Sequence, residues 1–217
     1  YGVILKTTDG GKSWLMPGEG QVLPPLNHVR FFGPDEGVAV GEATPDFPTG
    51  VLTTRDGSET WQPAPGKRAA GWHAAAFTEL NDGIVVGPRG SVSLVAGTNV
   101  APPRLDASSL RGIRAVDSAD GLTAWAVGDG ATVLSSSNGG VSWKALNASF
   151  PPELSRFVDF AAVSAVNSKV WVAGNPGSCV WHSRDGGTVW TRQATGHSTP
   201  IHALNFSTEE TGFAVGA

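Results

Sequence analysis

The sequence is poor in cysteine, tyrosine and charge. One cysteine among 217 residues, Cys179, excludes an internal disulfide, and we interpret it as a small strand residue rather than a reactive thiol. No apolar run approaches the roughly 18 residues that a membrane-spanning helix needs, so we expect no membrane span. Only 16% of the residues are charged, the net charge is −4, and no basic run occurs. Nucleic acid is therefore not an expected partner.

Familiar catalytic motifs are missing as well. The chain has no Gly-x-Ser-x-Gly elbow, no His-Glu-x-x-His pair and no phosphate-binding glycine loop. We therefore expect no enzymatic activity. Glycine (29) and proline (15) are plentiful and indicate many turns, while apolar residues, at 40%, are too frequent for a disordered chain. Helical periodicity is absent, which favours an all-β fold.

A short octet recurs four times, as TTDGGKSW (7–14), TRDGSETW (54–61), SSNGGVSW (136–143) and SRDGGTVW (183–190). The spacing of its tryptophans predicts one further copy, at 82–97, that has lost the octet. An aspartate or asparagine followed by glycine favours a tight hairpin, and the tryptophan can pack between sheets. We interpret these residues as structural: Asp9, Trp14, Asp56, Trp61, Asn138, Trp143, Asp185 and Trp190.

Two apolar segments accompany each octet. Runs that end in glycine lie at 37–41, 83–87, 124–128, 170–174 and 212–216, and a first strand precedes each, at 28–32, 73–77, 112–116, 159–163 and 202–206. Four short strands per period of about 43 residues predict a β-propeller. We expect one domain over 1–217 with five four-stranded antiparallel blades. The units are 25–68, 69–106, 107–152, 153–199, and 200–217 joined to 1–24.

The two ends of the chain read as parts of one unit. GFAVGA (212–217) followed by YGVILKTTDGGKSW (1–14) has the same order of segments as the internal units. This predicts a closed five-bladed ring in which N- and C-terminal strands complete one blade and remove exposed sheet edges. A window from a longer repeat protein, which would form an open arc or recruit a second chain, is the alternative.

The first strands suggest a polar column at the propeller axis. The column consists of His28, His73, Asp159 and His202, with Gly112 at the equivalent position between His73 and Asp159, and Arg30 and Arg114 lie two residues after His28 and Gly112. Histidine and carboxylate are ligands for Zn²⁺ or another divalent metal, and arginines could hold an anion. The alternative is that these side chains bind water or the backbone of the next blade. Weaker candidates at the same end are Glu42, Asp129, Asn175 and Trp72.

The octets resemble Asp boxes, the bacterial neuraminidase repeats. The sequence of residues 212–216 and 2–14 is most similar to that of photosystem II assembly/stability-factor-like propellers. This resemblance implies a propeller scaffold and a non-enzymatic assembly role, although known members commonly have seven blades. The resemblance to sialidases does not extend to their site, which needs three arginines and a tyrosine–glutamate pair, because the one tyrosine is Tyr1.

These observations favour a non-catalytic scaffold that recognises a protein or peptide on one face of the propeller, outside the cytoplasm. No cofactor is expected, apart from the divalent metal that the axial column could hold. Two alternatives remain open. One is a carbohydrate-binding, lectin-like propeller, and the other is a metal-dependent enzyme that uses the His/Asp column.

Overall fold

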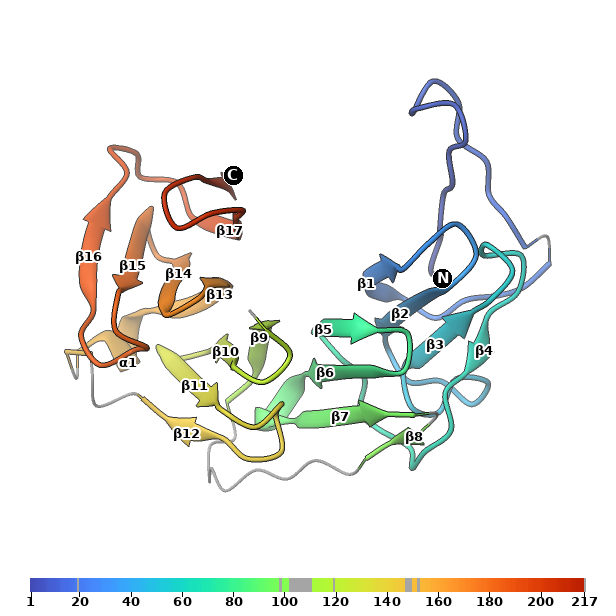
Figure 1. Ribbon diagram of the computed structural model, residues 1–217, viewed down its shortest axis with the longest axis horizontal. Coiled ribbons are helices and arrows are strands. Elements are labelled where there is room, and N and C mark those ends of the chain that lie inside the picture. Colours follow the sequence, from blue (N-terminus) through green and yellow to red (C-terminus); the bar gives the residue numbers. More distant parts are fainter. Residues whose placement is uncertain are drawn as a thin grey trace.

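The computed structural model describes residues 1–18, 20–97, 99–101, 111–118, 120–146, 150–151 and 153–216 (Figure 1). Four antiparallel sheets of four strands, named blades 1 to 4, follow one another along the chain. Blade 1 comprises β1 (Leu26–Phe31), β2 (Gly37–Gly41), β3 (Val51–Thr54) and β4 (Gln62–Pro63). Blade 2 comprises β5 (Ala74–Glu79), β6 (Asp82–Val86), β7 (Val92–Ala96) and β8 (Asn99–Val100), with the 3₁₀ turn η1 (Pro88–Gly90).

Blade 3 comprises β9 (Ile113–Ser118), β10 (Ala124–Gly128), β11 (Thr132–Ser136) and β12 (Lys144–Ala145). Blade 4 comprises β13 (Asp159–Val166), β14 (Lys169–Asn175), β15 (Cys179–Ser183) and β16 (Thr191–Ala194), and the short helix α1 (Leu154–Phe157) precedes it. β17 (Ile201–Phe206) and β18 (Gly212–Gly216) form a two-stranded sheet, named the half-blade.

The blades stand side by side in an open arc, with the first strand of each on the inner side and the fourth on the outer side (Figure 1). This is the arrangement of a β-propeller, so the predicted all-β class, antiparallel blades and order of strands are confirmed. The copy without an octet, predicted at 82–97, forms β6 and β7 of blade 2. Among the described residues, no helix has the length and apolarity to cross a membrane.

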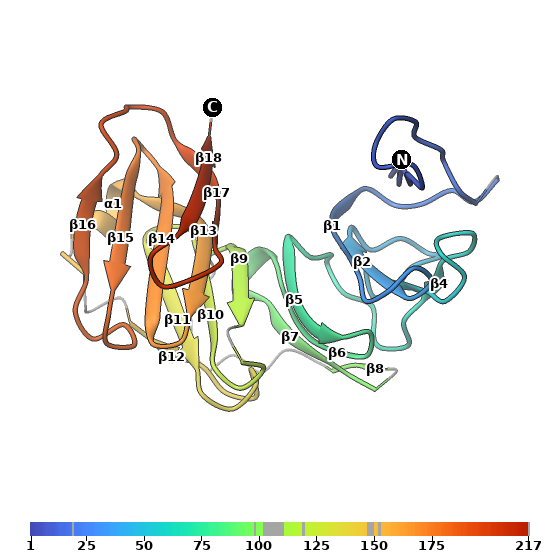
Figure 2. The ribbon, with the colours of Figure 1, turned by 45° about the horizontal axis from the view of Figure 1, so that its top comes forward.

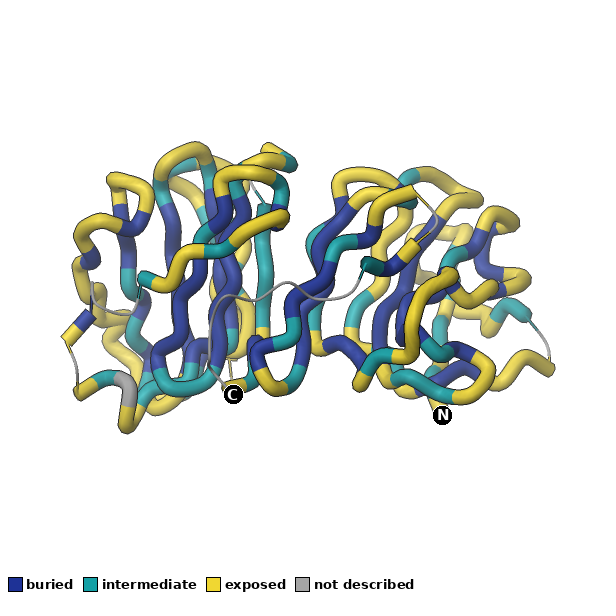
Figure 3. The backbone as a smooth tube through the Cα atoms, turned by 90° about the horizontal axis from the view of Figure 1, so that it is seen from below, coloured by how far each residue is buried: buried dark blue, intermediate teal, exposed yellow. Residues whose placement is uncertain are grey.

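The core lies between neighbouring blades. Val38 and Val40 of β2 are fully buried against Ala75 and Phe77 of β5. At the other joints, the second strand of one blade packs in the same way against the first strand of the following blade. Figure 3 shows the result, buried central strands between exposed loops. Each sheet therefore depends on its neighbours for burial, as expected of repeat architectures.

The octets form the predicted tight hairpins. In the second copy the Thr54 hydroxyl donates to Asp56 (2.8 Å) and accepts the Ser58 N–H (3.0 Å), and Asp56 accepts two hydrogen bonds from Thr60 (2.9 and 2.6 Å). These hydrogen bonds lower the pKa of Asp56 to about 2. Ser58 adopts a φ of 83° where the other octets have glycine, and its hydroxyl accepts the Trp61 indole N–H (2.9 Å).

The described residues do not form the predicted fifth blade. β17 and β18 pair only with each other in the described part of the chain, and residues 2–16 form a separate hairpin, named the N-terminal hairpin, on blade 1. The Gly2 N–H donates to Leu23 O (2.9 Å), and the Lys6 ammonium donates to Gly57 O (3.0 Å). These contacts hold the hairpin at the opposite end of the arc from the half-blade. The structure therefore has the open arc, the alternative to ring closure.

Candidate functional site

The first strands share a β-bulge near the axis. Gly128 at the end of β10 pairs with Ile113, Val127 pairs with Ala115, and Arg114 between them is the extra residue. Other first strands carry the same irregularity, so equivalent bulge positions exist around the arc. The bulge residues are Asn27, Arg114, Ala161 and His202, and His73 holds the same place relative to Gly87 in blade 2.

This register differs from the predicted axial column. His73 and His202 share the bulge position, but His28 lies one residue after it and Asp159 two residues before it. The bulge inserts a residue whose side chain changes face, and it leaves no mark in the sequence pattern. The His28 ring is partly buried, and its Nε2 has no partner among the described residues. Burial, together with the nearby charge of Arg30, lowers the pKa of His28.

The bulge side chains tie one blade to the next. The Asn27 amide donates to Trp72 O (2.8 Å), and His73 Nδ1 donates to Ile113 O (2.8 Å), which is the equivalent carbonyl one blade further on. A carbonyl only accepts, so Nδ1 carries the proton in this hydrogen bond. The structure thus gives His73 the alternative role, hydrogen bonding to the backbone of the neighbouring blade.

Charged side chains meet at the joint between blades 3 and 4. Arg114 pairs with Asp129 and lies 4.0 Å from an Asp159 carboxylate oxygen, and Asp159 accepts the Gly130 N–H at 2.7 Å. We name His73, Arg114, Asp129 and Asp159 the axial cluster. Within the described ranges, no three His, Cys, Asp or Glu side chains are grouped as a metal ion would need. His28, Arg30 and His202 belong to other blades and lie outside the cluster.

The weaker candidates separate in the structure. Glu42 and Asn175 are exposed, and only Asp129 of that group joins the axial cluster. Trp72 is buried, and its indole N–H donates to Thr49 O (2.7 Å), so it packs in the joint between blades 1 and 2.

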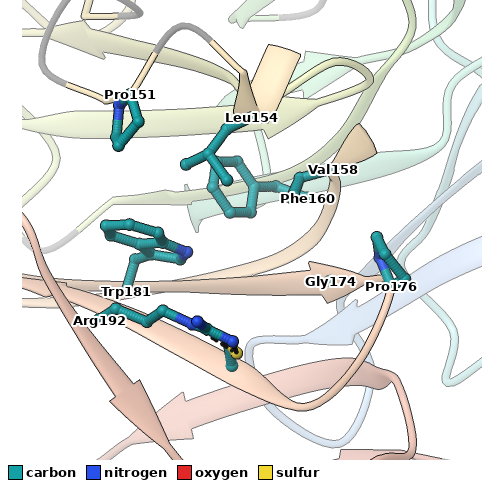
Figure 4. Close-up of a pocket in the computed structure, with 9 residues that line it drawn as sticks. Pro151, Leu154, Val158, Phe160, Gly174, Pro176, Trp181 and Arg192 are labelled. Atoms are coloured by element: carbon teal, nitrogen blue, oxygen red, sulfur yellow. Dashed lines mark hydrogen bonds between the residues drawn. The ribbon is translucent and has the colours of Figure 1, made fainter. Parts of the chain in front are cut away.

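An apolar pocket of about 400 Å³ opens at blade 4, and sequence reasoning missed it. Figure 4 shows Leu154, Val158 and Phe160 on one side, facing Trp181 and Arg192 on the other. The exposed Arg192 guanidinium donates to the Cys179 sulfur at 2.9 and 2.7 Å, which fixes it over the pocket. The remaining lining residues are Pro151, Gly174 and Pro176.

The pocket exists because the chain between β12 and β13 is long and folds partly as α1. Leu154 at the start of α1 and Pro151 before it cover one side of β15. The signal in the sequence was the length of this connection with its paired prolines, but its position over β15 cannot be derived from spacing. β13 begins at Asp159, β14 ends at Asn175 and β15 begins at Cys179, so the pocket and the axial cluster share one end of blade 4.

Comparisons with known proteins identify a family and solved structures that this chain resembles. A family model described as photosynthesis system II assembly factor YCF48 matches residues 107–217. A solved structure of YCF48 bound to D1 peptide is 17% identical with a TM-score of 0.63, over 88% of this chain and 60% of that one. YCF48 from Cyanidioschyzon merolae is 23% identical with a TM-score of 0.59, over 83% of this chain and 60% of that one.

An ancestral GH74 enzyme is similar at 15% identity and a TM-score of 0.70, over 93% of this chain and 30% of that one. A search of the curated proteins gave no significant match. At these identities the structural neighbours show the fold alone, and the chain spans about 60% of the length of the YCF48 structures. The matched region, 107–217, is more than half of the chain and contains blades 3 and 4 with the half-blade. The chain therefore belongs to the photosynthesis system II assembly factor YCF48 family.

Proposed function

We propose that this chain is a non-catalytic, protein-binding assembly factor that recognises a peptide segment at the end of blades 3 and 4. The observation that carries the proposal is the apolar pocket under the Arg192 guanidinium. Its volume of about 400 Å³ can hold one apolar side chain. Burying such a side chain contributes about 0.8 kcal/mol per methylene group.

The polar groups around the pocket suit a peptide backbone. Arg192 can donate to a carbonyl or carboxylate while keeping its contact with Cys179. The axial cluster lies at the same end of blade 4 and offers both charges, Arg114 and Asp159, to a segment that continues inward. Because the strands carrying these residues are fixed by the interblade core, little ordering entropy is lost on binding.

The comparisons support a protein partner. A family relative is described as bound to D1 peptide, and the family name is that of an assembly factor. The GH74 likeness concerns the fold alone. A location outside the cytoplasm stays a prediction, as do a glycan ligand and a metal at the axis.

The test is a binding measurement on the purified chain. A random peptide library displayed on phage, with a D1 peptide as a separate probe, is selected against the wild type, and affinities are measured by calorimetry. We expect Arg192→Ala to weaken binding roughly tenfold or more, as for loss of a charge-assisted hydrogen bond of about 1.5–3 kcal/mol. Leu154→Asp, which puts a carboxylate into the pocket, should abolish binding.

The matched control is Arg184→Ala, an exposed arginine at the other end of blade 4. It should bind as the wild type does. Binding that Arg184→Ala weakens and Arg192→Ala does not would contradict the proposal, as would a failure of every peptide to bind. A glycan array that gives specific binding while the peptides fail would favour the lectin alternative.

A further inference from the structure

Aromatic rings form one wall of the apolar pocket at blade 4, where α1 lies beside the sheet (Figure 2). The half-buried Trp181 ring meets the edge of Phe150, with ring centroids 5.5 Å apart and planes at 75°. Phe150 in turn packs against Phe160 (5.6 Å) and Trp190 (4.9 Å) and is itself buried. The rings hold one another in place before a ligand arrives, so binding here costs little ordering entropy.

A guanidinium group stands on the same wall. Trp181 pairs with Arg192 across β15 and β16, and Cys179 lies two residues before Trp181, so the three side chains share one face of the sheet. Two nitrogens of Arg192 donate to the Cys179 sulfur at 2.9 and 2.7 Å. Among the described residues the cation–π pair is Arg30 with Phe32, so the face of the exposed Arg192 guanidinium is free to stack on a ligand.

The polar side chains of the pocket favour one kind of ligand. As the structure describes it, the lining contains no aspartate or glutamate, and its polar side-chain groups are the Arg192 guanidinium, the Trp181 indole N–H and the Cys179 thiol. A cationic ligand would meet Arg192 with no carboxylate in the lining to compensate. An aromatic ring instead offers the guanidinium the negative face of its quadrupole and offers Trp181 an edge or a face.

The size of the pocket agrees with this chemistry. Its volume of about 400 Å³ lies at the lower end of the range for small-molecule sites, roughly 300–1,000 Å³. A short aliphatic side chain would leave part of this space empty, and unfilled space loses dispersion contacts with the lining. A planar ring fills more of the space between the two walls.

We infer that the pocket takes an aromatic side chain of the partner peptide. The ring lies between Trp181 on one wall and the aliphatic Leu154 and Val158 on the other, with the Arg192 guanidinium against its face (Figure 4). The peptide as the source of the ring rests on the proposed function. Recognition of the ring itself is a property of the pocket, and a probe smaller than a peptide measures it.

Nuclear magnetic resonance of methyl groups tests the position of the ring. The probe is N-acetyl-phenylalanine amide, which should bind with a dissociation constant on the order of 1 mM, as a ligand of this size permits. The ring current should shift the methyl signals of Leu154 and Val158. The matched probe, N-acetyl-cyclohexylalanine amide, has the same carbon skeleton without the π system and should give no such ring-current shifts. The methyl groups of Leu52, buried in blade 1, should not respond to either probe.

Titrations with the two probes test the role of the guanidinium. The aromatic probe should bind the wild type about two- to fivefold more tightly than the cyclohexyl probe, the range for one cation–π contact at an exposed site. Arg192→Met keeps an apolar stem, removes the charge and should abolish this preference. Arg184→Met, a change at an exposed arginine at the other end of blade 4, should retain it. N-acetyl-lysine amide should not bind.

Equal affinities for the two probes in the wild type, or no shift of the Leu154 and Val158 methyl signals with the aromatic probe, would overturn the inference. Phage selection reports separately on the proposed function. Peptides that bind this pocket through an aliphatic side chain would keep the proposed function and reject the aromatic ligand. A phenylalanine probe that binds as expected while every peptide fails would support the aromatic site and reject the peptide as its source.

Discussion

The octets at 7–14 and 54–61 share the hydrogen bonds of the turn, but their tryptophans differ in burial. Thr7, Asp9 and Ser13 make the contacts that Thr54, Asp56 and Thr60 make, at distances that agree within about 0.2 Å. Yet Trp14 is 58% exposed and Trp61 is 2% exposed.

The difference arises from what surrounds each turn. Trp61 lies against the ring of Phe31 on β1, with centroids 6.1 Å apart, and within the core cluster that includes Ile4. In the described part of the chain no inner strand pairs with the N-terminal hairpin, and Trp14 belongs to none of the core clusters found there. The turn is therefore a local structure, whereas the burial of its tryptophan depends on the rest of the blade and its neighbour.

The largest expected effect separates the two tryptophans. Trp61→Ala should lower the free energy of unfolding by about 3–5 kcal/mol, because it leaves a cavity and an unpaired Ser58 hydroxyl. Trp14→Ala should cost less than about 1 kcal/mol, because most of this side chain is already exposed. Urea unfolding of both variants measures the difference. Equal losses would show that the turn itself, and not its surroundings, carries the stability.

A second pair of variants compares the octet hydroxyls. Ser183 is fully buried, donates to Asp185 (2.8 Å) and accepts the Gly187 N–H (2.8 Å). Ser183→Ala should cost about 1–3 kcal/mol, because it leaves a buried N–H without a partner. Thr7→Ala should cost less, since water can reach the exposed Gly11 N–H. Thermal unfolding followed by circular dichroism compares them, and a larger loss for Thr7→Ala would contradict the comparison.

The third pair compares a closed joint with the open end of the arc. Asp117 accepts the Ala165 N–H (2.8 Å) across the joint between blades 3 and 4, and burial raises the pKa of Asp117. The raised pKa means that its contribution to stability is largest in acid and falls as the pH rises through the pKa of the folded state. At neutral pH Asp117→Asn should match or exceed the wild type, whereas Asp117→Ala should lose about 1–3 kcal/mol.

Asn205 provides the control, because it faces Phe213 in the half-blade as Asp117 faces Trp125 in blade 3. Asn205 is exposed, so Asn205→Ala should leave the unfolding curve unchanged. A loss as large as that of Asp117→Ala would contradict the comparison.

The smallest expected effect is on the loss of folding stability in acid. Hydrogen bonds from Ser13 and Thr60 lower the pKa values of Asp9 and Asp56 to about 2, so the stability from each is present above about pH 3.8 and is lost as the pH falls toward 2. Asp56→Asn should make unfolding less dependent on pH in this range. Asp9→Asn should change it less, because the exposed hairpin contributes little to global stability. Acid titration followed by circular dichroism checks both.

The repeat could be predicted because it depends on residues that are close together in the sequence. Glycine-ended runs such as 124–128 and 212–216 became β10 and β18 with the predicted bounds, and the octets became hairpins. Each depends on turn residues and alternation within a few positions of the chain.

The site could be predicted only in part. The sequence pointed to the axial end of the first strands and included His73, Arg114 and Asp159, which the structure brings near one another. It could not reveal the bulge at Arg114, which changes the register, or the position of α1 over Trp181. These features arise from contacts between segments distant in the sequence, as does the choice between a closed ring and an open arc.

Hydrogen exchange with a bound peptide tests the central functional claim most directly. The amides of α1, the start of β13 around Phe160, and β15 from Cys179 to Trp181 should exchange more slowly when a selected peptide is bound. The octet turns at the opposite end of the blades should be unchanged. Protection confined to the octet turns, or to blade 1, would contradict the assignment of the binding site to this end of blades 3 and 4.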